Sequence, residues 1–112
     1  MNDFVSTLPS KDLERFCHRW QIRELAVFGS ALRDDFCPES DVDVLVTFSD
    51  TSQWGLFEHA QIQQELQALI QRKVDLISRR ALSQTRNVII RDEILRTAKT
   101  FFSEGEIIHA ER

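Results

Sequence analysis

Two aspartates that stand one residue apart are the side chains of this chain best suited to chemistry. Asp41 and Asp43 interrupt an apolar run that continues through Val46. On an extended strand, side chains at positions i and i+2 point to the same face, with Cα atoms about 6.5–7 Å apart. Like charges there repel each other and lose hydration. Because a divalent cation offsets both effects and Mg²⁺ prefers carboxylate oxygens, the pair predicts a magnesium site. The structural alternative is a strand start with solvated carboxylates.

A third acid, Asp75, interrupts the apolar sequence of Val74, Leu76 and Ile77. If the two acidic strands are neighbours, all three carboxylates converge on one point. Three carboxylates around two cations about 3.5–4 Å apart suit an in-line displacement at phosphorus. We therefore predict that Asp75 completes the site; a single charge on an edge strand is the alternative.

The step Gly29-Ser30 closes the apolar run Leu25–Phe28 and is suited to hold phosphate. Glycine allows a phosphate to approach the backbone closely, and amides at the start of a following helix bind phosphate oxygens, here with the Ser30 hydroxyl. Arg33, one turn further, either reaches the same phosphates or forms a salt bridge with a neighbouring aspartate.

Helices and strands must alternate to position these residues. The expected helices are Ser10–Trp20 with Ser10 as N-cap, Trp54–Gln71 and Ala81–Phe102; the expected strands are 25–28, 41–48 and 73–78. Residues 30–36 are a short helix or loop, and a polar tail begins near residue 103. The long helix between the second and third strands predicts a parallel crossover. The whole pattern predicts an α/β (α+β-like) fold, with a small mixed sheet and packed helices in a single domain, 1–112.

Composition excludes several classes of protein. The net charge of −4 argues against nucleic-acid binding through bulk charge, and no apolar run reaches the ~18–20 residues of a membrane span. The N-terminus lacks the features of a secretory signal, and two cysteines are too few for a disulfide framework, so we expect a cytoplasmic protein. The three histidines have no metal-ligand spacing and are expected at the surface or at the rim of the core, and the glutamine-rich side of helix 54–71 is expected to be solvated.

The combined pattern Gly29-Ser30, Asp41, Asp43 and Asp75 resembles the DNA polymerase β-like nucleotidyltransferase superfamily. The short length and the string Phe28–Arg33 make the chain most similar to the minimal nucleotidyltransferases, over roughly residues 20–100. Many members have a glycine after the arginine, where this chain has Asp34, which leaves the shape of that loop open.

The resemblance implies an activity. Asp41 and Asp43 would hold two Mg²⁺ ions, Asp75 would complete the catalytic metal site, and Gly29 and Ser30 would hold the β- and γ-phosphates of ATP. Minimal nucleotidyltransferases are commonly antitoxins of HEPN-domain ribonuclease toxins, so the implied acceptor is a tyrosine hydroxyl on the toxin, which would receive AMP. The chain itself has no tyrosine. A non-catalytic antitoxin that masks the toxin by binding is the alternative, and an enzyme that modifies a small molecule is a third possibility.

Overall fold

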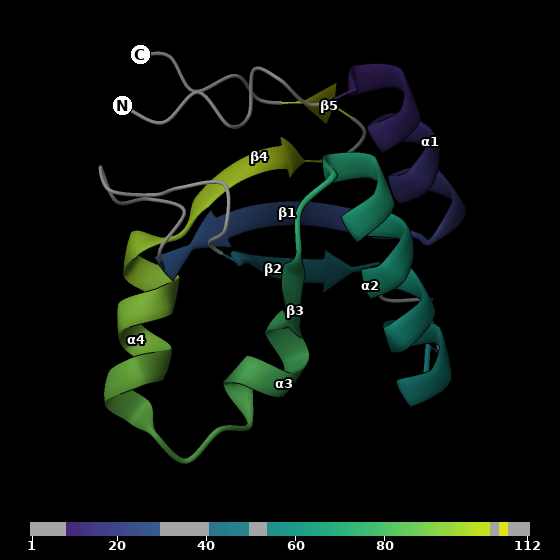
Figure 1. Cartoon of the computed structure of the whole chain (residues 1–112). Helices are drawn as coiled ribbons and strands as arrows, with labels where there is room; N and C mark the ends of the chain where they lie inside the picture. Colours follow the sequence, from purple (N-terminus) through teal and green to yellow (C-terminus); the bar gives the residue numbers. More distant parts are fainter. Residues whose placement is uncertain (1–8, 30–40, 50–53, 104–105, 108–112) are drawn as a thin grey trace.

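A mixed sheet of five strands organises the fold, in the order β3-β2-β1-β4-β5 (Figure 1). The structure is a computed structural model that describes residues 9–29, 41–49, 54–103 and 106–107. The strands are β1 Ile22–Phe28, β2 Val42–Phe48, β3 Val74–Ser78, β4 Lys99–Ser103 and β5 Glu106–Ile107. β2 and β3 are parallel, and the other neighbouring pairs are antiparallel. The predicted mixed sheet and its parallel crossover are therefore confirmed.

Four helices connect and cover the strands: α1 Ser10–Arg19, α2 Leu56–Ile70, α3 Arg79–Ser83 and α4 Val88–Thr97. α1 and α2 were predicted within two residues of their ends. Pro9, not Ser10, occupies the N-cap of α1. The start of α2 is fixed by the Glu58 carboxylate, which accepts a hydrogen bond from the Gly55 amide at 2.9 Å. None of the helices in the described ranges is long and apolar enough to cross a membrane.

The predicted single helix 81–102 is wrong, because the chain there forms α3, α4 and then β4. Asn87 interrupts the helical run, since its side chain caps α4 by accepting from the Ile90 amide at 3.1 Å. After Thr97 the sequence Lys-Thr-Phe-Phe-Ser pairs with β1 instead of continuing the helix. β-branched and aromatic residues suit a strand, and Phe101 and Phe102 are both buried there.

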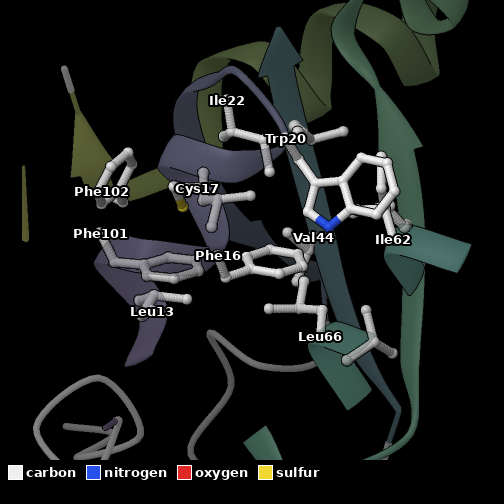
Figure 2. Packing of buried hydrophobic residues seen from close by; sticks show 14 of the residues in the cluster. Leu13, Phe16, Cys17, Trp20, Ile22, Val44, Ile62, Leu66, Phe101 and Phe102 are labelled. Carbon is white, nitrogen blue, oxygen red and sulfur yellow. The ribbon is translucent and has the colours of Figure 1, made fainter. Parts of the chain in front are cut away.

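One face of the sheet, covered by α1 and α2, holds the main hydrophobic core (Figure 2). Strand alternation sends Val42, Val44 and Val46 to this face. They meet side chains of both helices and of β4, among them Leu13, Phe16, Cys17, Trp20, Ile62, Leu66, Phe101 and Phe102. The other face, over which α3 and α4 lie, has a small cluster of four buried residues: Ala26, Phe28, Leu45 and Leu82.

The glutamine-rich side of α2 closes the edge of the sheet, contrary to the expectation that it is merely solvated. Gln67 and Gln63 accept hydrogen bonds through their Oε1 atoms from the β3 amides of Val74 and Leu76, at 3.0 and 3.2 Å. Nε2 of His59, a partly buried residue, lies 2.9 Å from the Leu76 carbonyl oxygen. These three side chains satisfy outward backbone groups of β3 that would otherwise offer an open edge.

Candidate functional site

The carboxyl end of β1 brings Gly29 against Asp43. Phe28 and Asp43 are partners in the antiparallel register of β1 and β2, so the residue after Phe28 passes close to the aspartate. Gly29 has φ +68°, a left-handed conformation that favours glycine. A Cβ atom at Gly29 would lie 2.4 Å from Oδ2 of Asp43, which is too close for any other residue without a shift. The glycine therefore makes room for the carboxylate itself.

Asp75 lies directly across from Asp43, as the predicted neighbouring strands require. In the parallel register of β2 and β3, Asp43 pairs with Asp75, and Val44 pairs with Leu76. Since Val44 and Leu76 face the main core, alternation directs both aspartates to the face of α3 and α4. Like charges directly opposite each other on neighbouring strands destabilise a sheet. The arrangement therefore does not serve stability, but it suits the binding of a cation.

Asp41 immediately precedes β2 and lies two residues before Asp43, on the same side by alternation. Its side chain and that of Asp75 are exposed, whereas Asp43 is half-buried. Among the described residues, no three acidic, histidine or cysteine side chains are gathered closely enough to form a metal site. The carboxylate donors nevertheless have the chemistry that Mg²⁺ requires, and two of them share one rung of the sheet. Their joint coordination of a metal remains a prediction.

Two residues predicted to bind nucleotide, Ser30 and Arg33, lie outside the described residues. Gly29 is thus the part of the predicted phosphate loop whose position is known, and it lies where the prediction requires, at the end of β1 and beside Asp43.

A cavity of about 720 Å³ opens at the other end of β2 and β3. Its walls include Thr47 and Ser78 at the carboxyl ends of these strands, His59 of α2 and Arg80 of α3. Since four residues of a strand span about 13 Å, this cavity is separate from the carboxylates at the opposite end. Arg79 is anchored there, because its Nε donates to Thr47 Oγ1 at 2.9 Å.

Cys17 is a residue of the hydrophobic core. It is fully buried on α1, and this burial, together with the nearby charge of Glu14, raises the pKa of its thiol far above the usual range. Trp54 packs edge-on against Trp20 at a centroid distance of 5.2 Å, and its Nε1 donates to the Trp20 carbonyl.

Comparison with known proteins agrees with this geometry. Residues 10–104 match the family model described as "Nucleotidyltransferase domain". The chain is 33% identical over 78 residues to a protein from Thermococcus cleftensis named Protein adenylyltransferase MntA, a match that covers 70% of this chain and 74% of the relative.

Solved structures with the same fold include one named as a minimal nucleotidyltransferase, which is 30% identical, has a TM-score of 0.59 and is matched over 79% of this chain and 84% of its own. A toxin–antitoxin structure with AMP-PNP has a TM-score of 0.63 at 18% identity, covering 86% of this chain and 74% of that chain. A complex of the tri-AMPylated HEPN toxin of Shewanella oneidensis with its MNT antitoxin has a TM-score of 0.56 at 17% identity, covering 92% and 73%. The family model matches nearly the whole of this chain, and the acids and the glycine meet at one end of the sheet. This chain therefore belongs to the nucleotidyltransferase domain family.

Proposed function

We propose that the chain is a Mg²⁺-dependent nucleotidyltransferase and an antitoxin, which transfers AMP from ATP to a tyrosine hydroxyl of a HEPN toxin. The observation that carries this proposal is the meeting of Gly29 with Asp43, on the same rung as Asp75. Two carboxylates on one rung do not stabilise a sheet, and Gly29 is needed there only because the Asp43 carboxylate occupies the space of its side chain. Neither feature is explained by a purely structural role.

Each residue has a distinct part in the proposed reaction. The backbone at Gly29 and the Ser30 hydroxyl hold the triphosphate, because backbone amides and a hydroxyl can donate hydrogen bonds to phosphate oxygens. Asp41 and Asp43 hold the metal ions, with Asp75 as a further ligand. Bound Mg²⁺ would neutralise charge on the phosphates and on the leaving group.

The reaction is a displacement at the α-phosphorus. The acceptor oxygen forms a bond to this phosphorus, the bond to the oxygen that bridges the α- and β-phosphates breaks, and pyrophosphate leaves. Asp75 lies at the exposed side of the rung and takes part in removing the hydroxyl proton. Catalysis then depends on position and charge neutralisation, as in other phosphoryl transfers.

The acceptor belongs to another molecule. This chain has no tyrosine, so a tyrosine acceptor must come from a partner. Two of the similar structures named above are toxin–antitoxin complexes, one with a tri-AMPylated HEPN toxin, which supports a toxin as that partner.

Intact-mass spectrometry of the toxin tests the proposal. We would incubate this chain with the product of the neighbouring gene (the candidate HEPN toxin), MgCl₂ and ATP, and expect the toxin mass to rise in steps of one AMP. Asp43→Asn should lower the rate by about 10²–10³-fold, because charge stabilisation of this kind contributes that much. Asp12→Asn, an exposed carboxylate of α1, is the matched control and should transfer AMP normally.

A tight complex whose toxin mass is unchanged with the wild-type chain would contradict the proposed transfer. It would instead support the alternative of an antitoxin that acts by binding alone.

A further inference from the structure

α4 is a helix that buries none of its own side chains. Its apolar residues Val88, Ile89, Ile90 and Leu95 are exposed, and Ile89 has 82% of its surface accessible. We call these four residues the α4 surface. Only Ile94 and the following Ala98 pack, partly buried, against the small cluster that contains Phe28. A ten-residue helix is marginal in water unless tertiary packing covers its apolar side, and valine and isoleucine are poor helix formers.

The α4 surface belongs to the same end of the molecule as the candidate site. α4 lies over the face of the sheet to which Asp43 and Asp75 point (Figure 1). Lys99, which follows α4, pairs with Val27 of β1, so the C-terminal end of the helix lies beside the strand end that leads into Gly29. A protein that presents a hydroxyl to the carboxylates must approach at this end, and it would therefore come close to α4.

The charge around α4 is opposite in sign to that of the whole chain. α4 itself is balanced, because Arg91 and Arg96 are paired with Asp92 and Glu93. The positive charge beside it comes from Arg86 and Lys99, just beyond its two ends, whereas the whole chain carries a net charge of −4. Exposed apolar side chains within a basic surrounding fit a partner surface that is apolar at its centre and acidic at its rim.

A second copy of this chain fits the α4 surface poorly. In a two-fold contact each helix would meet its own copy, so the positive charges of Arg86 and Lys99 beyond its ends would be repeated on both sides of the contact. RNA would match the positive charge, but it prefers aromatic stacking platforms, whereas the exposed side chains here are aliphatic.

We infer that the α4 surface is the docking site for the protein that carries the acceptor hydroxyl, through an apolar patch of that protein bordered by acidic residues. This inference rests on the proposed function and adds to it the surface that recognises the toxin.

Binding of the HEPN toxin by calorimetry tests the inference. Ile89→Asp should raise the Kd at least 10-fold, since it places a charge at the centre of the apolar contact. The same change should leave the fold intact, because Ile89 is exposed and an acidic residue suits the first turn of a helix. Leu56→Asp is the matched control: Leu56 is an aliphatic residue of α2 with 90% of its surface exposed, in the first turn of its own helix, and its variant should bind within twofold of the wild type.

Several outcomes would overturn the docking site. One is unchanged binding and AMP transfer by Ile89→Asp, which leaves the proposed function standing. Another is a dimer of the chain alone that Ile89→Asp dissociates, because it assigns the surface to a second copy. A third is binding of a single-stranded RNA probe that Ile89→Asp abolishes. By contrast, a wild-type chain that neither binds nor modifies the toxin refutes the proposed function, and the docking site with it.

Discussion

The two faces of the sheet differ in what covers them. The face under α1 and α2 packs large apolar side chains from four strands and two helices, and most of them are fully buried. The face under α3 and α4 has four buried residues, carries Asp43 and Asp75, and is covered by a helix with an exposed apolar surface. The first face therefore supplies most of the apolar packing, and the second face supplies less and carries the residues of the proposed site.

This division explains why acidic residues are tolerated on a small domain's sheet. Because one face already provides a complete core, the other can hold like charges on one rung and an incompletely buried helix.

The largest expected effect is on stability, from Phe101→Ala on the packed face. Phe101 is 1% exposed, and its truncation should lower the free energy of unfolding by about 3–5 kcal/mol. Ile94→Ala on α4 should lower the free energy of unfolding by only about 1 kcal/mol, because Ile94 is half-buried and its side chain buries less apolar surface than Phe101. Urea unfolding followed by circular dichroism measures both. Equal losses for the two variants would refute the proposed division between the faces.

The next effect is on activity, from Gly29→Ala. The added Cβ would meet the Asp43 carboxylate and would sit in a left-handed conformation, so we expect AMP transfer to fall about 10²-fold through misplacement of the acid. Gly55→Ala is the control, since φ at Gly55 is −98° and its Cβ would be 3.3 Å from a flexible glutamate oxygen. Initial rates of toxin modification give the comparison, and full activity of Gly29→Ala would show that the close approach is dispensable.

A pH effect should arise from Cys17 on the packed face. Burial raises the pKa of its thiol, so the folded state keeps the proton while the unfolded thiol ionises near pH 8.5. Stability from this residue is therefore complete below pH 8 and falls at higher pH, by about 2 kcal/mol between pH 8 and 10. Denaturant titrations of the reduced protein at these pH values would detect the decline. In Cys17→Ala the decline should be smaller by that amount, and an identical slope in both proteins would contradict the assignment.

The smallest effect should come from the sheet edge. Gln63→Ala removes the acceptor of the Leu76 amide, and we expect a loss of about 1 kcal/mol because water can reach this part-buried group. Gln64→Ala, an exposed neighbour on the same helix, should change stability little. Thermal unfolding separates the two; equal stability of both variants would mean that the glutamine is merely solvated, as its polar character first indicated.

The sequence predicted the acidic end of the fold better than the rest. The spacing of Asp41 and Asp43 and the isolated Asp75 depend on strand alternation, a local rule, and the long helix between them requires a parallel crossover. The approach of Gly29 to Asp43 could not be predicted in detail, because it depends on the antiparallel register of β1 and β2.

The C-terminal half was harder because tertiary pairing overrode local periodicity. Apolar residues recur at helical spacing at positions 90, 94, 98 and 101. Phe101 nevertheless belongs to β4, which pairs with the edge of β1. The edge-closing side chains His59, Gln63 and Gln67 are four residues apart along α2, which marks one line on the helix. This spacing alone does not predict that these side chains contact β3.

The most direct test of the central claim is a crystal structure of this chain soaked with Mn²⁺ and AMP-PNP, with anomalous scattering used to locate the metal. We predict an anomalous peak within coordinating distance of the Asp43 and Asp75 carboxylates, with the nucleotide phosphates beside Gly29. A peak at the far end of β2, in the cavity beside Arg80, or nucleotide bound without any metal at these acids, would contradict the account.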